Sequence, residues 1–204
     1  MENIGNIVAG ILMAGAPLLI FEAISRQYKV SAELTRKSIH VLSAVVIAYM
    51  TLFLSLNEIA FISVLFFLLL AVTHRYRIWK SIHSIKRDSY GEVMFAVGVI
   101  LAALLAQEER IFACAVLVMG VSDTVAAVIG QHYTKAHKIL GPKTLEGSIG
   151  FFLITVFLLG AFGVASIYTA FAIASLVTIA ELMSRNGWDN IAVPLLVVLF
   201  FNFI

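Results

Sequence analysis

The chain has 204 residues, of which 61% are hydrophobic and 13% are charged, with a formal net charge of +2. Soluble domains contain roughly 45–50% apolar and about 25% charged residues, so this composition excludes an ordinary soluble protein and indicates an integral membrane protein. The single cysteine excludes a disulfide framework. We expect one integral-membrane domain over residues 1–204, in which any binding site is built from helix ends and short loops.

Eight apolar segments approach or reach the roughly 20 residues that a membrane-spanning helix needs. In chain order they are Ile4–Ile24, Ile39–Leu56, Ile59–Val72, Val93–Ala106, Ile111–Gly130, Ile149–Ser166, Tyr168–Met183 and Ile191–Ile204. The third, fourth and last of these are short. The predicted fold is therefore all-α, a polytopic membrane protein with about 7–8 transmembrane helices.

Basic residues follow every second predicted span. The residues concerned are Arg26, Lys29, Arg36, Lys37, Arg75, Arg77, Lys80, Lys86, Arg87, Lys135, Lys138, Lys143 and Arg185. The alternate loops contain only Arg110. The positive-inside rule then places the basic loops in the cytoplasm and the N-terminus outside, which suits a prokaryotic inner membrane.

The longest polar connection follows the third predicted span. Ile78, Ile82 and Ile85 recur there at helical spacing among basic residues. This pattern is typical of a helix lying at the lipid surface, and an ordinary basic loop is the alternative.

The fifth predicted span contains an ionisable residue, Asp123. On a helix, Asp123 shares one face with Gly120, Ala127 and Gly130. Small residues let a neighbouring helix approach closely, so Asp123 is expected to face the protein interior. A carboxylate inside a membrane span indicates a functional site; the structural alternative is a carboxylate that is paired with a buried arginine or capped by hydroxyl groups.

The loop after this span contains a predicted turn at Gly141-Pro142. The turn is followed, just before the next apolar segment, by Lys143, Thr144, Glu146 and Ser148. A helix start offers unpaired backbone N–H groups and the positive end of a dipole, and with a lysine it makes a phosphate cradle. The Walker A pattern is absent. The alternative is an ordinary helix start capped by Thr144 or Ser148.

A second group of polar residues, Arg36, Lys37 and His40, shares one helix face at spacings of three and four. Two cations beside a span can hold a polyphosphate. The alternative is a basic membrane anchor in which Glu33 pairs with Lys37. For His40, a proton-transfer role stands against that of a satisfied interior histidine.

Carboxylates recur near the ends of other spans. Glu92 begins the fourth span, where Ser89 and Glu92 also fit a capping box. Further along, Glu181 and Arg185 are spaced for an i,i+4 ion pair.

The last apolar segment is preceded by Asp189 and Asn190, either of which could cap the final helix, with Pro194 in or near its first turn. These groups bring carboxylates and cations to the cytoplasmic ends of different spans. Mg²⁺ takes one or two carboxylates together with substrate phosphates and waters. The sequence therefore predicts metal–nucleotide chemistry at the inner face of the membrane.

Four motifs carry a family resemblance: RKSIH, SYGEVMF, SDTVAAVIG with GPKTLEGS, and ELMSRNGWDNIAVP. In this order they resemble the membrane kinases for polyprenols and related lipid alcohols, a group that includes dolichol kinase, phytol kinase and the CTP-dependent diacylglycerol kinase. The phosphatidate cytidylyltransferases are distantly similar. The resemblance runs from Arg36 to Pro194, and its specific part is D-x-x-A-x-x-x-G followed by K-T-x-E-G-S.

The resemblance implies a multi-span α fold that transfers a phosphoryl group from a nucleotide, usually CTP, to a lipid hydroxyl with Mg²⁺. By motif match, Asp123 would be a metal or nucleotide ligand, and Asp189 and Asn190 match the acidic–Asn pair before the last helix. The nucleotide loop would comprise Lys143, Thr144, Glu146, Gly147 and Ser148. Cytidylyltransferases typically show Ser-Pro-Lys-Lys-Thr and a Lys-Asp ending, whereas this chain has Gly-Pro-Lys-Thr and Asp-Asn, which favours the kinase branch.

Phosphoryl transfer requires positioning and charge neutralisation. We expect Asp123 to hold Mg²⁺ with help from Glu92 or Asp189. The phosphate oxygens are expected to be neutralised by Arg36, Lys37 and Lys143. Asp189 or His40 would take the proton of the lipid hydroxyl.

The expected partners are CTP or another nucleoside triphosphate, a lipid alcohol and membrane lipids, with no nucleic acid. Gly160 and Gly163 leave room for close helix contacts within the chain or in a homo-oligomer. Two alternatives stay open: a cytidylyltransferase that makes a CDP-lipid, and a transporter in which Asp123 relays ions. A transporter needs polar groups along a continuous path, whereas here they gather at one face, which favours the enzyme.

Overall fold

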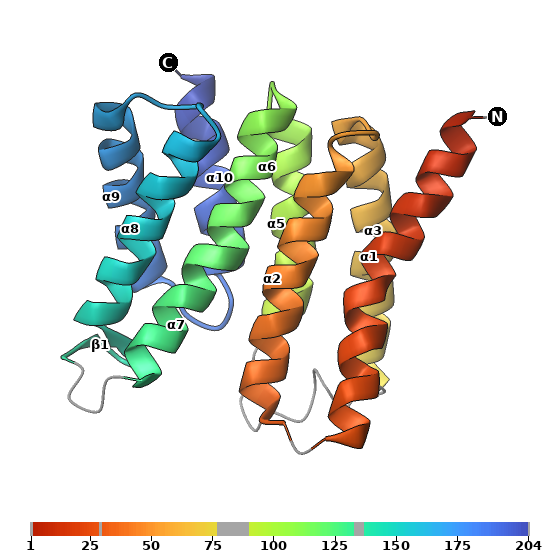
Figure 1. The fold of residues 1–204 in the computed structure, drawn as a ribbon, viewed down its shortest axis with the longest axis horizontal. Helices are drawn as coiled ribbons and strands as arrows, with labels where there is room; N and C mark the ends of the chain where they lie inside the picture. The colour runs from red at the N-terminus through yellow and green to blue at the C-terminus, as the bar shows by residue number, and fades with distance from the viewer. Residues whose placement is uncertain (1, 29, 77–89, 133–136, 204) are drawn as a thin grey trace.

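A computed structural model of the chain describes residues 2–28, 30–76, 90–132 and 137–203. The helices are α1 (Glu2–Gln27), α2 (Ala32–Met50), α3 (Leu56–Tyr76), α5 (Gly91–Leu105), α6 (Glu109–Leu117), α7 (Asp123–His132), α8 (Leu145–Ala161), α9 (Ile167–Met183) and α10 (Asp189–Asn202), with a π-helical turn η1 (Val118–Ser122) between α6 and α7. The described helices stand side by side, and both termini lie at the same end (Figure 1). The predicted all-α class is confirmed.

The long apolar helices fit an integral membrane protein. Within the described ranges, three helical segments are long and apolar enough to cross a membrane, namely Ile4–Gln27, Leu56–Thr73 and Glu109–His132. Shorter apolar helices cover Gly91–Leu105, Leu145–Ala161, Ile167–Met183 and Asp189–Asn202. Each predicted span has a helical counterpart, while the number of crossings and the outside N-terminus stay predictions.

Capping residues move the ends of α2 away from the predicted span Ile39–Leu56. The helix begins at Ala32 because the Ser31 side chain accepts a hydrogen bond from the Leu34 N–H. It ends at Met50, and a new cap at Ser55 starts α3. Hydropathy locates the apolar part of a helix, whereas local hydrogen bonds set its ends. The early start places Arg36 and Lys37 on a rigid helix rather than in a loop.

A short antiparallel hairpin, β1 (Lys138–Leu140) and β2 (Lys143–Thr144), lies between α7 and α8. The sequence did not predict these strands, which are too short to show a period of two. The predicted turn at Gly141-Pro142 is confirmed: Gly141 has φ +57°, a left-handed conformation that glycine adopts without strain. The hairpin leads directly into α8.

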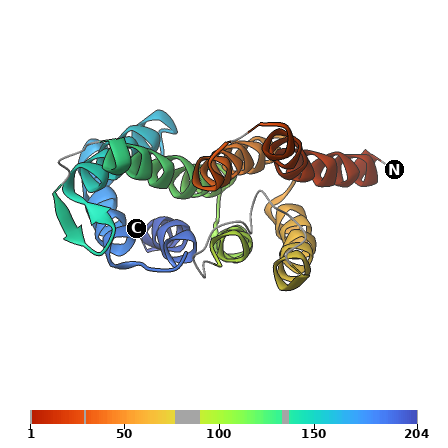
Figure 2. The same cartoon turned by 90° about the horizontal axis from the view of Figure 1, so that it is seen from below.

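Seen from below, the helices form two rows, with α1, α2 and α7 in one and α3, α5 and α10 in the other (Figure 2). Close approaches pack neighbouring helices against one another. A Cβ atom on Gly98 of α5 would overlap the backbone oxygen of Asn190 on α10, and one on Gly120 would overlap Ala44 of α2. Among the described residues, nothing lies within 4 Å of such an atom on Gly160 or Gly163, so these two glycines make no close helix contact within the chain.

The predicted lipid-surface helix with Ile78, Ile82 and Ile85 lies outside the described residues, as does the predicted cap residue Ser89. Glu92 of the predicted capping box is in the first turn of α5.

We expect Gly98→Ala to lower the free energy of unfolding by about 1–3 kcal/mol, because overfilling a close-packed contact forces the backbones apart. Gly160→Ala is the matched control, since the added methyl group meets no described atom. Unfolding of both variants in detergent would be compared with the wild type. Equal stability of the two variants would contradict the close α5–α10 approach.

Candidate active site

A polar cavity of about 470 Å³ lies where α2, α7, the hairpin and the facing ends of α8, α9 and α10 meet. Its ionisable lining residues are Glu33, Arg36, Lys37, Asp123, Lys143, Glu181, Arg185 and Asp189. They come from segments far apart in the sequence, and the fold brings them to one site. Most of the polar groups that the sequence places on one side of the protein thus line a single cavity.

Asp123 is buried, with 8% of its surface exposed, and begins α7 directly after the π-helical turn. Such turns are often found at functional sites. The Lys37 ammonium donates a hydrogen bond to the Asp123 carboxylate and forms a buried ion pair with it. The sequence expectation that Asp123 faces the interior is confirmed, and its partner is a lysine from α2.

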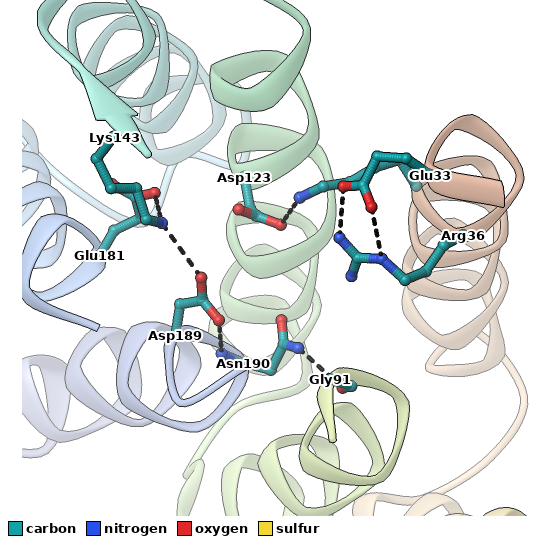
Figure 3. A network of polar contacts seen from close by, with 9 residues as sticks. Glu33, Arg36, Gly91, Asp123, Lys143, Glu181, Asp189 and Asn190 are labelled. Atoms are coloured by element: carbon teal, nitrogen blue, oxygen red, sulfur yellow. Dashed lines mark hydrogen bonds and ion pairs between the residues drawn. The ribbon is translucent and has the colours of Figure 1, made fainter. Parts of the chain in front are cut away.

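On the other side of Asp123, Lys143 reaches two carboxylates (Figure 3). Its ammonium donates to the Glu181 carboxylate and lies 3.4 Å from Asp189 Oδ2. Burial alone would lower the pKa of Lys143, but the carboxylates of Glu181 and Asp189 raise the pKa above its ordinary value. Lys143 therefore stays charged at neutral pH.

The predicted pair of Glu181 with Arg185 is wrong, because Glu181 pairs with Lys143 of the hairpin instead. Glu181 is 2% exposed, and its second oxygen, Oε2, has no hydrogen-bond partner among the described residues. An unsatisfied buried carboxylate oxygen is costly. The position of Glu181 therefore calls for a ligand.

Asp123, Glu181 and Asp189 form a carboxylate cluster. Each offers one oxygen, and these three oxygens lie within 4.8 Å of one another. Hard divalent cations such as Mg²⁺ bind carboxylate oxygens, and the unpaired oxygen of Glu181 points to the same need. The donor set fits such an ion. Predicted ligands Asp123 and Asp189 are in the cluster, whereas Glu92 is outside it and Glu181 stands in its place.

Glu181 was detectable from the sequence by the criterion that singled out Asp123. It is a carboxylate within an apolar run, VTIAELM, in a predicted span. Because Arg185 lies at helical spacing from Glu181, the sequence suggested a local ion pair and gave no sign of the long-range pair with Lys143.

The Glu33–Lys37 pair, which the alternative interpretation of this segment required, is not formed. Glu33 accepts two hydrogen bonds from Arg36, at 2.8 and 3.4 Å, because Lys37 turns towards Asp123. Arg36 lines the cavity beside this pair. Two of the three predicted phosphate-binding cations, Lys37 and Lys143, are thus held by carboxylates of the cluster.

Thr144 caps the start of α8, as the alternative interpretation of this loop allowed. Thr144 Oγ1 accepts a hydrogen bond from the Gly147 N–H at 3.2 Å. Thr144, Gly147 and Ser148 line the cavity, but Glu146 does not. Its carboxylate instead accepts from the His137 backbone N–H at 3.0 Å and contacts the His137 ring.

At the start of α10, neither Asp189 nor Asn190 caps the helix, which begins at Asp189 after Trp188 without a side-chain cap. The Asn190 amide donates to the Gly91 carbonyl at 2.9 Å, which ties α10 to α5. Pro194 lies inside α10.

His40 lies apart from the carboxylate cluster. It is 7% exposed, and its ring meets that of Phe95 edge-on, with 4.6 Å between centroids. His40 and Glu92 line a separate apolar pocket rather than the polar cavity.

The fold and the cavity define a helical membrane protein with an acidic site edged by cations. The chain is 32% identical over 197 residues to phytol kinase of Synechocystis, covering 89% of this chain and 83% of the relative. It is 28% identical over 118 residues to an uncharacterised protein of Methanocaldococcus jannaschii, covering 57% of this chain and 60% of the relative. No protein-family model and no solved structure matches. The chain belongs to the polyprenol and phytol kinase family.

In metal-free buffer, we expect Lys37→Met to lower the free energy of unfolding by about 3–5 kcal/mol, because it leaves the Asp123 carboxylate buried without a partner. The double variant Lys37→Met/Asp123→Asn should regain most of this loss. A double-mutant cycle of unfolding in detergent measures the coupling. Additive losses would show that the two residues do not form the buried pair.

Proposed function

We propose that this protein is a membrane-embedded kinase that transfers a phosphoryl group from a nucleoside triphosphate, preferably CTP, to the hydroxyl group of a lipid alcohol. The carrying observation is a cluster of three carboxylates flanked by Lys37, Lys143 and Arg36 in one cavity. Membership of a family that includes a phytol kinase supports the reaction class. The acceptor would be a polyprenol, a phytol-like isoprenoid or diacylglycerol, and the active site would face the cytoplasm of a prokaryotic cell.

Asp123, Glu181 and Asp189 would hold Mg²⁺. When bound, the ion neutralises charge that develops on the transferring phosphoryl group. The balance of charges supports this assignment: the four carboxylates that line the cavity offset its four basic side chains, so Lys37 and Lys143 are held by carboxylates before a polyphosphate binds. With a divalent cation held by Asp123, Glu181 and Asp189, Lys37 and Lys143 would be available to bind phosphate oxygens.

The residues of the chain then position the two substrates. Lys37, Lys143 and Arg36 bind phosphate oxygens, and the backbone N–H groups at the start of α8 add further donors near Gly147 and Ser148. The alcohol oxygen attacks the terminal phosphorus, the bond from that phosphorus to the bridging oxygen breaks, and the nucleoside diphosphate leaves. The hydroxyl proton passes to Asp189, which lines the polar cavity, or to His40, which lines the apolar pocket.

Product analysis tests the reaction. Purified protein in mixed micelles would receive Mg²⁺, CTP or ATP labelled in the terminal phosphate, and one of phytol, farnesol, a long polyprenol, diacylglycerol or phosphatidate. We expect the label to move to an alcohol. Release of pyrophosphate with phosphatidate would instead establish a cytidylyltransferase, and absence of turnover by folded protein would contradict both enzymes.

We expect Asp123→Asn and Glu181→Gln to lower kcat at least a hundredfold, a loss of about 2.7 kcal/mol in barrier terms, because each removes a carboxylate from the proposed metal site. Glu22→Gln is the matched control: its carboxylate pairs with Arg26 at 2.8 Å and does not line the cavity. Rates of label transfer would be measured for all three variants. Activity of Glu181→Gln within about tenfold of the wild type would remove Glu181 from the site.

A further inference from the structure

Arg185 lines the polar cavity but has no ion-pair or side-chain hydrogen-bond partner among the residues that the structure describes. The other three basic side chains of the cavity lie in the ion pairs Glu33–Arg36, Asp123–Lys37 and Glu181–Lys143. A guanidinium offers five N–H donors and no acceptor. Because no carboxylate holds these donors among the described residues, they are available to a ligand in the cavity.

A tight turn after α9 fixes the backbone of Arg185. The Trp188 N–H donates to the Arg185 carbonyl at 3.1 Å, and the two residues between them, Asn186 and Gly187, have φ of 54° and 94°. Asn-Gly is the pair that adopts positive φ at both central positions most readily. A Cβ atom on Gly187 would lie 2.7 Å from Gly91 Cα, so the turn is packed against the start of α5. Arg185 therefore projects from a fixed backbone.

The cavity has a buried end and an exposed edge. Asp123 and Glu181 are 8% and 2% exposed, whereas Arg185 is exposed. Under the proposed function, the transferring phosphoryl group lies beside the buried carboxylates. The nucleoside is bulky and polar, so it extends from there towards water. The phosphates nearest to the nucleoside then pass the exposed edge at which Arg185 lies.

We propose that Arg185 binds the phosphates that remain on the nucleotide after the transfer. Its planar fork of donors matches two phosphate oxygens. Lys37 and Lys143 must exchange a carboxylate for a phosphate, whereas Arg185 breaks no ion pair of the described residues when it binds. Arg185 is thus a substrate-binding residue on the leaving diphosphate. This inference rests on the proposed kinase function.

Binding of a nucleoside diphosphate tests the proposal without turnover. Purified protein in detergent with Mg²⁺ would be titrated with CDP and with ADP in a calorimeter. We expect Arg185→Gln to raise the Kd of the diphosphate about tenfold, because a hydrogen bond between charged groups is lost. Arg185→Lys keeps the charge without the fork and should lie between Arg185→Gln and the wild type.

Arg75→Gln is the matched control. Arg75 lies near the end of α3, is also an exposed arginine without a partner among the described residues, and does not line the cavity. Its Kd should match that of the wild type. An unchanged Kd for Arg185→Gln would overturn the proposal. Equal weakening by both variants would also overturn it, since that result would show a general effect of charge.

Steady-state rates locate the contact along the nucleotide. We expect Arg185→Gln to raise the KM for the nucleoside triphosphate about tenfold while kcat changes less than about threefold, because the contact is made equally in the ground state and the transition state. The KM for the lipid alcohol should not change. A loss confined to kcat, with normal diphosphate binding, would place Arg185 at the transferring group and overturn the proposal.

The two proposals fail in different ways. If the wild type binds a nucleoside diphosphate but transfers no phosphoryl group, the kinase function is wrong, and the Kd of Arg185→Gln alone decides whether Arg185 binds phosphates. If the wild type transfers the label but Arg185→Gln binds the diphosphate normally, the kinase function stands and the role of Arg185 is wrong. Absence of any nucleotide binding by folded wild-type protein would overturn both.

Discussion

The polar end of this protein is organised around the mutual repulsion of three buried or half-buried carboxylates. Asp123, Glu181 and Asp189 come from three different helices, yet their oxygens lie within 4.8 Å of one another. Like charges at this separation disfavour ionisation unless cations compensate them. Lys37 and Lys143 supply that compensation from α2 and the hairpin. The cluster therefore sets where α2 and the hairpin must lie relative to α7, α9 and α10.

The apolar part of the fold supplies the rigidity that the cluster requires. Gly98 and Gly120 allow backbones to approach so closely that no side chain fits between them. The Asn190 amide joins α10 to the start of α5. Because these contacts fix the helices that carry the carboxylates, repulsion at the site does not separate the helices. Helix packing elsewhere in the bundle thus offsets the repulsion among the three carboxylates.

The sequence predicts the helices well because a membrane-length apolar run has few alternatives to a helix. It also predicts an inward-facing Asp123, since small residues share its helix face. The predicted helix ends are displaced because single hydrogen bonds set them. The hairpin was not predicted because its strands have only two or three residues. The partners of charged groups were missed for another reason. Glu33 has both Arg36 and Lys37 at helical spacing, and spacing alone does not choose between them. Packing turns Lys37 towards Asp123 and brings Lys143 to Glu181 in place of Arg185.

We propose that Asp123, Glu181 and Asp189, and not Glu92, form a divalent metal site. Binding of Mn²⁺ to chelator-treated protein, followed by electron paramagnetic resonance, tests it without any turnover. The wild type and Glu92→Gln should each bind one ion with similar affinity, while Asp123→Asn and Glu181→Gln should lose that binding. Retained binding in Glu181→Gln together with its loss in Glu92→Gln would contradict this metal site.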